Sequence, residues 1–255
     1  MKININADIG ESYGHFRMGN DAELMKLIGS ANIACGLHAG DPTIMAQTVE
    51  TALVEKVSIG AHPGFNDIWG FGRRQIKMRP LDLEYSVTYQ IGALMAIAQA
   101  KGATVTHVKP HGALNNMAHD SADIAMAIGR GIKAADPSLI YVANANSEMT
   151  RAGARLGLTV ANEAYVDRRY DDTGKMLSRD LDAAVITDPR EAADQVLRIL
   201  EDGAIHSVNG TRIPASVHTF CIHGDEPTAV PVMRMVRERL AAAEHEVVTL
   251  PAMMA

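Results

Sequence analysis

Aromatic residues, cysteine and positive charge are all scarce in this chain, and each scarcity excludes a class of protein. Aromatic residues make up 4% of the 255 positions, which leaves too few rings for the stacking surfaces that bind single-stranded nucleic acid. The net charge of -6 lacks the basic excess on which phosphate-backbone binding depends, so we expect no nucleic-acid partner. The two cysteines, Cys35 and Cys221, make no disulfide framework, and we expect a reducing, cytoplasmic location.

Long hydrophobic runs and low-complexity linkers are also absent from the sequence. A membrane-spanning helix needs an apolar run of about 18 residues, so we expect no membrane association. The segment Met1–Asp8 reads as a strand rather than as a signal peptide. The hydrophobic content of 47% is ample for one large core, and we predict a single domain over residues 1–255.

What the chain does contain is an alternation of strand-like and helix-like segments. The predicted strands are Ile3–Ala7, Ala31–Cys35, Val57–Ala61, Thr104–Val108, Leu139–Ala143, Thr159–Glu163 and Val217–Ile222. The predicted helices are Asp21–Ile28, Thr43–Glu55, Leu81–Lys101, Ala122–Ala135, Ser147–Leu156, Pro189–Asp202 and Thr228–Ala243. This alternation predicts an α/β fold, an irregular seven-stranded β/α barrel similar to a TIM barrel, rather than an open doubly wound sheet.

The first strand supports a barrel. Its residues Asn4, Asn6 and Asp8 share one face, opposite an apolar face. In an open parallel sheet both faces meet helices and the strand reads as apolar. A polar face therefore favours a strand that lines a barrel interior, and an edge strand with one wet face is the alternative.

Polar residues follow the carboxyl end of each predicted strand. The densest group is the segment His107–Asn116, in which His107, Lys109 and His111 alternate along one face. Pro110 and Gly112 should end the strand there. The other groups are Asp8 with Glu11, Cys35 with His38 and Asp41, His62 with Asp67, Asn144 with Asn146, Glu163–Asp172, and His223 with Asp225 and Glu226. Because β/α barrels assemble their sites at this end, we predict one shared active-site mouth.

These residue types suit two kinds of chemistry. Asp8 and His111 are the leading candidates for general acid or base, and Lys109 could stabilise a developing oxyanion. A divalent metal is the second candidate, and its ligands would be Asp8, His38, His62, His111 and His223. No local signature such as His-Glu-x-x-His is present, so imidazoles that only form hydrogen bonds are the alternative.

Nucleophilic and phosphate-binding signatures are weak. We expect Cys35 and Cys221 to be buried core thiols rather than nucleophiles. The segment Gly14–Asn20 has the glycine spacing of a Walker loop but lacks its Lys-Ser/Thr ending. Arg73 and Arg74 follow a glycine pair and could hold a carboxylate or phosphate, with a solvated loop as the equal alternative.

The chain resembles the LamB/YcsF family in six ordered blocks that run almost from end to end. They are Asn6-Ala-Asp-Ile-Gly-Glu-Ser-Tyr-Gly14, Ile33-Ala-Cys-Gly-Leu-His-Ala-Gly-Asp-Pro42, Gly60-Ala-His-Pro63 with Gly70-Phe-Gly-Arg-Arg74, Lys109-Pro-His-Gly-Ala-Leu114, Glu163 with Asp167-Arg168 and Tyr170, and Cys221-Ile-His-Gly-Asp225. The resemblance implies an irregular seven-stranded barrel related to polysaccharide deacetylases. It also implies ATP-dependent opening of the 5-oxoproline lactam to L-glutamate by one subunit working with two partner subunits.

On both grounds we predict the following site. The catalytic residues are Asp8, Lys109, His111 and Glu163. The substrate-binding residues are Glu11, His38, His62, Arg73, Arg74, His107, Asn116, Arg168, His223 and Asp225. ATP would be handled largely by the partner subunits. The chain could also form a homo-oligomer. The chain departs from the usual family pattern at Gly64-Phe-Asn66 and at Asn115, so a metal-dependent deacetylase or amidohydrolase acting on another amide is an alternative. A non-catalytic regulatory subunit is another.

Overall fold

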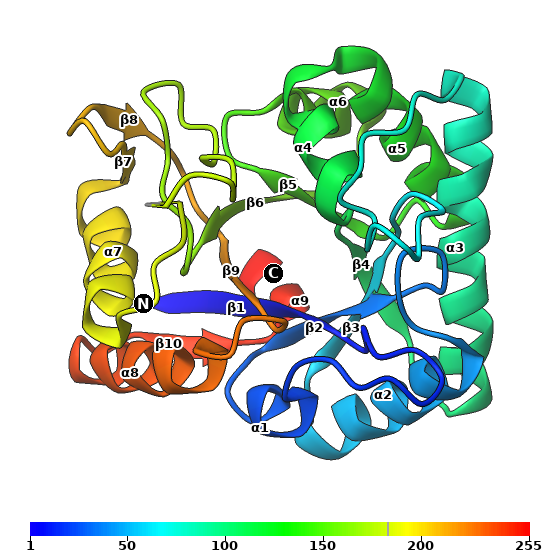
Figure 1. Cartoon of the computed structure of the whole chain (residues 1–255), viewed down its shortest axis with the longest axis horizontal. Helices are drawn as coiled ribbons and strands as arrows, with labels where there is room; N and C mark the ends of the chain where they lie inside the picture. Colours follow the sequence, from blue (N-terminus) through cyan, green and yellow to red (C-terminus); the bar gives the residue numbers. More distant parts are fainter. Residues whose placement is uncertain (183) are drawn as a thin grey trace.

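Seven parallel strands close into a barrel in the computed structural model, which describes residues 1–182 and 184–255 (Figure 1). The barrel strands are β1 (Lys2–Ile9), β2 (Ser30–Ala34), β3 (Ser58–His62), β4 (Val105–Val108), β5 (Ile140–Asn144), β6 (Val160–Tyr165) and β9 (Thr219–His223). They pair in this order, and β9 returns to β1 through the register Asn4–Thr219 to Asp8–His223, which closes the ring. The predicted seven-stranded β/α barrel is confirmed.

Helices surround the barrel and connect successive strands (Figure 1). They are α1 (Asp21–Met25), α2 (Pro42–Glu55), α3 (Pro80–Ala100), α4 (Gly112–Asp120), α5 (Ala122–Ala135), α6 (Glu148–Leu156), α7 (Pro189–Asp202), α8 (Ala229–Ala242) and α9 (Leu250–Met254). Asp41 and Asp188 cap α2 and α7 by accepting backbone N–H bonds ahead of a proline, as their sequence predicts. No described helix is both long and apolar enough to cross a membrane.

Four features of the fold were not predicted. Helix α4 begins at Gly112, where we expected only that the strand would end, and places Asn115 and Asn116 on a helix. A short antiparallel hairpin joins β7 (Ala204–His206) to β8 (Arg212–Pro214). Strand β10 (Glu246–Val248) pairs in parallel with the amino-terminal residues of β1, and α9 follows β10 in the chain. These elements are three to nine residues long, so their periodicity is too short to read.

A small apolar cluster covers the closed end of the barrel. Leu250 of α9 is fully buried against Ile140, Val142 and Ala161. Its backbone N–H donates to Ser30 Oγ at 3.1 Å, which ties the chain terminus to a barrel strand. Helix α9 therefore plugs the end of the barrel that lies opposite the carboxyl ends of the strands (Figure 1).

Above this plug the interior is polar, as the first strand predicts. Asn6 Nδ2 donates to Thr219 Oγ1 at 2.7 Å and to Glu163 Oε1 at 2.9 Å. Asn32 Nδ2 donates to Asn6 Oδ1 at 2.6 Å. These amides are buried, and each Nδ2 group donates to a side chain on a neighbouring barrel strand or, from Asn6 to Glu163, on the strand beyond it. The polar face of β1 therefore lines a barrel interior and is not a wet edge.

The same layer holds His107 against a glycine. Gly60 lies opposite His107 in the β3–β4 register, and a Cβ on Gly60 would overlap the imidazole ring. The ring therefore occupies the space that a side chain at position 60 would need.

We predict that Gly60→Ala lowers the free energy of unfolding by about 1–3 kcal/mol, because overpacking a closed interior forces neighbours out of place. The measurement is urea denaturation. Gly92→Ala is the matched control, since Gly92 lies on α3 with open space around it, and alanine should stabilise a helix there by up to about 1 kcal/mol. Equal stability changes in the two variants would contradict the packing argument.

Candidate active site

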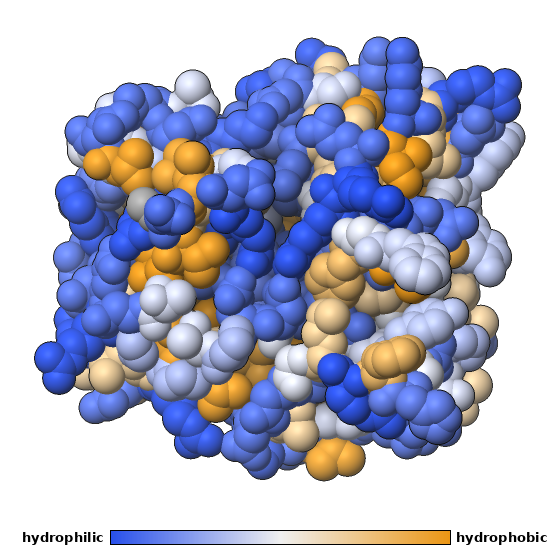
Figure 2. All heavy atoms as spheres, viewed as in Figure 1, coloured by the Kyte–Doolittle hydropathy of each residue, from blue (hydrophilic) through white to orange (hydrophobic). Residues whose placement is uncertain are grey.

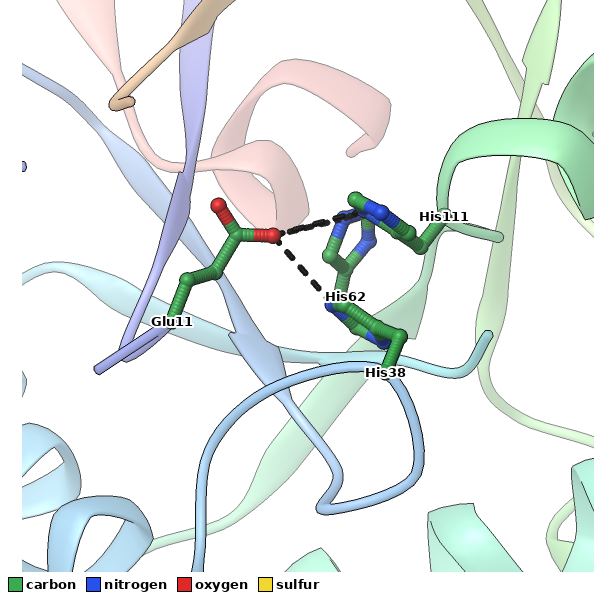
Figure 3. A group of neighbouring side chains, drawn as sticks. All are labelled: Glu11, His38, His62 and His111. Atoms are coloured by element: carbon green, nitrogen blue, oxygen red, sulfur yellow. Dashed lines mark hydrogen bonds and ion pairs between the residues drawn. The ribbon is translucent and has the colours of Figure 1, made fainter. Parts of the chain in front are cut away.

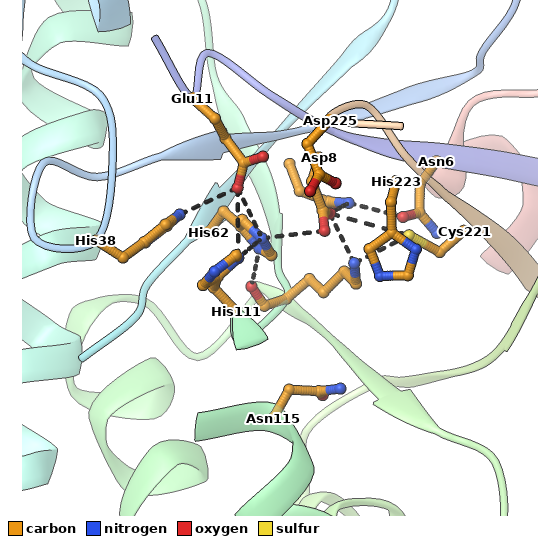
Figure 4. A network of polar contacts seen from close by, with 12 residues as sticks. Asn6, Asp8, Glu11, His38, His62, His111, Asn115, Cys221, His223 and Asp225 are labelled. Atoms are coloured by element: carbon orange, nitrogen blue, oxygen red, sulfur yellow. Dashed lines mark hydrogen bonds and ion pairs between the residues drawn. The ribbon is translucent and has the colours of Figure 1, made fainter. Parts of the chain in front are cut away.

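A cavity of about 670 Å³ opens at the carboxyl ends of the strands. Its floor holds Asp8 from the end of β1 and Lys109 from the end of β4, and His111, Tyr165 and His223 form its walls. In Figure 4 the charged and imidazole groups point toward one another from the surrounding strand ends. The predicted shared mouth is therefore a real concavity with polar walls.

The floor is a buried ion pair. Lys109 Nζ lies 2.6 Å from Asp8 Oδ1 and 3.0 Å from Cys221 Sγ, and the side chains of Asp8 and Lys109 are almost fully buried. Asn32 Nδ2 donates to the same Asp8 oxygen at 3.0 Å. Burial alone would raise the pKa of Asp8, but His62 and the Lys109 ammonium hold it well below its usual range. Burial alone would lower the pKa of Lys109, but Asp8 raises it well above its usual value, so both groups are charged.

Beside the ion pair lies a cluster formed by Glu11, His38, His62 and His111 (Figure 3). Glu11 Oε1 lies 3.2 Å from His38 Nε2 and 3.3 Å from His111 Nδ1. His62 Nε2 lies 2.9 Å from His111 Nδ1. All four side chains are buried, and burial lowers the pKa of each imidazole. Burial and the nearby Asp8 carboxylate raise the pKa of Glu11 well above its usual range.

A second histidine arrangement stands on the opposite wall. His223 Nδ1 lies 2.9 Å from Asp167 Oδ2, and its ring stacks on Tyr165 with centroids 5.4 Å apart. Burial would raise the pKa of Asp167, but the His223 imidazole lowers it, so this carboxylate is ionised. An ionised carboxylate that accepts from Nδ1 leaves Nε2 of His223 free for proton transfer.

Two predicted site residues lie deeper in the barrel than the cavity floor. Glu163 is buried, accepts from Asn6, and has a raised pKa because of burial. His107 is fully buried one layer below Lys109, and burial lowers its pKa to about 3. Glu163 and His107 therefore lie beneath the Asp8–Lys109 ion pair and do not face the cavity.

Cationic side chains gather around the mouth. Arg73 lines the cavity and pairs with Asp225 at 2.6 Å across the opening. Arg168 and Arg179 also line it, and Arg179 Nη1 pairs with Glu226. Arg179 Nη2 is buried without a hydrogen-bond partner within the described chain. Arg74, by contrast, pairs with Asp67 and has a largely exposed side chain.

The structure thus brings most of the predicted residues to one place. The residues that line the cavity are Asp8, Arg73, Lys109, His111, Asn116, Arg168 and His223. Glu11, His38 and His62 lie in the buried cluster with His111, and Asp225 pairs with Arg73. Sequence reasoning did not single out Tyr165 or Arg179. Tyr165 lies two residues after Glu163 on the same strand face, so the period of the strand could have found it. Arg179 comes from a long loop without periodicity, and nothing in the sequence marks it.

The fold and the site together define a β/α-barrel protein with a buried polar centre of the kind that enzymes use. Residues 3–255 match the LamB/YcsF family, and the chain belongs to that family. A relative from Azoarcus sp. (strain BH72), a 5-oxoprolinase subunit by description, is 48% identical over 253 residues, which cover 99% of each chain.

Solved structures agree on the fold. The lactam utilization protein from Thermus thermophilus superposes with a TM-score of 0.92 at 41% identity, over 98% of this chain and 100% of that one. A peptidoglycan N-acetylglucosamine deacetylase catalytic domain from Eubacterium rectale gives a TM-score of 0.50 at 9% identity, over 97% of this chain and 87% of that one. That second likeness concerns the fold alone, and it bears out the expected similarity of fold to deacetylase barrels.

We predict strong coupling between Asp8 and Lys109 in a double-mutant cycle. Asp8→Asn and Lys109→Met should each lower the free energy of unfolding by about 3–5 kcal/mol, because each leaves the other charge buried without its partner. The double variant should lose clearly less than the sum of the two. Chemical denaturation of the four proteins measures the cycle, and strictly additive losses would show that the two charges do not stabilise each other.

Proposed function

We propose that this chain is the lactam-opening subunit of a 5-oxoprolinase, and that it converts 5-oxoproline to L-glutamate in an ATP-coupled reaction with two partner subunits. The names of its relatives support this substrate. The observation that carries the proposal is the buried ammonium of Lys109, held by Asp8 at the floor of a cavity lined by cations. Such a floor suits a reaction in which negative charge develops on oxygen.

ATP is needed because a lactam carbonyl resists water. Amide resonance makes the ring carbon a poor electrophile, and phosphorylation of the amide oxygen would remove that protection. The sequence lacks the Lys-Ser/Thr ending of a Walker loop. This absence motivates placing the phosphoryl transfer largely on partner subunits, whose existence is supported by the naming of the relatives as subunits. This chain receives the activated ring.

The side chains then divide the work. Water adds to the ring carbon as the C=N electrons move to the ring nitrogen, and the Lys109 ammonium stabilises the negative charge that develops on the attacking oxygen as its proton leaves. His223, oriented by the ionised Asp167, takes a proton from that water and returns it to the ring nitrogen as the C–N bond breaks. This step leaves an acyl phosphate, and attack of a second water on it releases inorganic phosphate and gives the new carboxylate of glutamate. This assignment differs from our expectation of Asp8 or His111 as the base. Asp8 is committed to Lys109, and the second nitrogen of His111, Nδ1, lies 2.9 Å from His62 Nε2 inside the buried cluster.

The cationic mouth fits an anionic ligand. An activated 5-oxoproline would carry a carboxylate and a phosphate, and arginine binds both groups through paired N–H donors. Arg73, Arg168 and Arg179 all line the cavity. The buried Nη2 of Arg179 has a free donor for such a group, with no hydrogen-bond partner among the described residues.

Removing the floor lysine or the proton-transfer histidine should strongly reduce turnover in the reconstituted complex. Purified chain, candidate partner subunits, ATP and 5-oxoproline are mixed, and glutamate and ADP are both followed. We expect Lys109→Ala to lower kcat by about 100–1,000-fold and His223→Gln by about 100–10,000-fold.

Arg239→Ala is the control for these variants, because Arg239 lies on the outer helix α8 and pairs only with exposed Asp194 among the described residues. Full activity in both site variants would sink the assignment. ATP-independent hydrolysis of other amides by the chain alone would instead place it with the metal-dependent amidohydrolases.

Arg179 should act on binding more than on chemistry. We expect Arg179→Gln to raise KM for 5-oxoproline in the complex by about 10–100-fold, the loss of one charged hydrogen bond, while kcat changes little. Steady-state kinetics on the reconstituted complex separates the two constants, and Arg239→Gln serves as the matched control. An unchanged KM would exclude Arg179 from the ligand site.

A further inference from the structure

The Glu11/His38/His62/His111 cluster contains two imidazoles whose tautomers are fixed by the backbone. His62 Nδ1 lies 2.6 Å from the Lys109 carbonyl oxygen. His111 Nε2 lies 2.8 Å from the Phe71 carbonyl oxygen. A carbonyl oxygen can only accept, so each of these nitrogens carries a proton and donates. In a neutral imidazole the other nitrogen then has a lone pair and no proton.

These two bare nitrogens face each other. His62 Nε2 and His111 Nδ1 are 2.9 Å apart, which is hydrogen-bond distance, but neither can donate. Two carboxylate oxygens add to the same place. Glu11 Oε1 lies 3.3 Å from His111 Nδ1, and Asp8 Oδ2 lies 3.2 Å from His62 Nε2. Acceptors that converge without a donor repel one another unless a cation lies among them.

The spacing of the cluster fits a metal ion. Ligand atoms at 2.0–2.1 Å from a tetrahedral zinc ion are roughly 3.3–3.4 Å apart. Glu11 Oε1 is 3.2 Å from His38 Nε2, 3.3 Å from His111 Nδ1 and 3.9 Å from His62 Nε2. The four ligand atoms lie within 4.8 Å of one another. Three nitrogens and one carboxylate oxygen are a ligand set that zinc favours over calcium or magnesium.

The rings are also held rigidly in place. His38 and His111 stack with centroids 3.7 Å apart and planes 5° from parallel. A Cβ on Gly64 would lie 2.6 Å from His38 Nδ1, and one on Gly72 would lie 2.8 Å from His111 Cδ2. The backbone therefore presses against both rings. The two carbonyl contacts supply the outer hydrogen bonds that orient histidine ligands in metal sites.

We propose that Glu11 Oε1, His38 Nε2, His62 Nε2 and His111 Nδ1 form a site for one divalent cation of the zinc type. The four ligands come from the carboxyl ends of β1, β2, β3 and β4, which are neighbours in the barrel. When bound, such an ion supplies a Lewis acid beside the cavity floor. Asp8 lies between this site and Lys109: its Oδ1 is held by the lysine, and it is not one of the four residues whose ligand atoms gather together. The competing occupant is a proton carried by Glu11 or His62.

Metal content measured without substrate or ATP tests the site, so its outcome does not depend on lactam opening. The full chain is stripped with a chelator, loaded with Zn²⁺ or Co²⁺, and dialysed. We expect about one ion per chain by elemental analysis and the visible absorption bands of four-coordinate Co²⁺. Loading should also raise the Tm, because the ion binds only the folded protein.

Variants decide whether the ion sits in the cluster. We expect His62→Ala with His111→Ala to weaken binding on the order of 100-fold or more. Glu11→Gln keeps the shape of the side chain and should weaken binding too, and circular dichroism checks that it folds. His15→Gln is the matched control, because His15 is exposed, and it should keep the ion. Wild-type protein that retains no more ion than the double variant would overturn the proposal, as would loss of the ion in His15→Gln.

Discussion

The ion pair between Lys109 and Asp8 is the contact around which the open end of the barrel is organised. It joins the ends of β1 and β4 across the interior, and both side chains are buried. A buried ammonium is costly unless a partner and further acceptors surround it. Cys221 and Asp8 surround this one, and Asn32 orients the carboxylate in turn. The polar side chains around Lys109 are therefore needed to keep its buried charge stable, whatever part they also take in the chemistry.

Asp8 also separates two chemically different halves of the site. One oxygen faces Lys109 and the other lies 3.2 Å from His62 Nε2. On the His62 side the bare nitrogens of His62 and His111 converge with carboxylate oxygens, which suits a cation. On the Lys109 side the cavity presents cations, which suits an anionic ligand. The Asp8 carboxylate therefore lies between a cluster that suits a cation and a cavity that suits an anionic ligand (Figure 4).

Polarity increases along the barrel axis from the plug to the mouth. Leu250 and its aliphatic neighbours close one end, amides such as Asn6 fill the middle, and charged groups gather at the other. The outer face around the mouth is largely hydrophilic, with apolar patches between the polar groups (Figure 2). The order follows from solvation, since a charge is tolerated best where partners and water can both reach it.

The sequence by itself determined the barrel and the location of the site. Strand and helix periodicity, together with polar residues after each strand, predicted the seven barrel strands and the mouth, and the bounds of α5 and α7 were predicted to the residue. Tertiary structure alone decided which side chains meet. His107 and Lys109 share a strand face, yet one lies in the core against Gly60 and the other at the floor, because a barrel stacks alternate residues in layers. The pairing of His223 with Asp167, and of Glu11 with three histidines, depends on contacts between residues far apart in the chain. Spacing along a sequence cannot specify those distances, because strand order and register are fixed only when the ring closes.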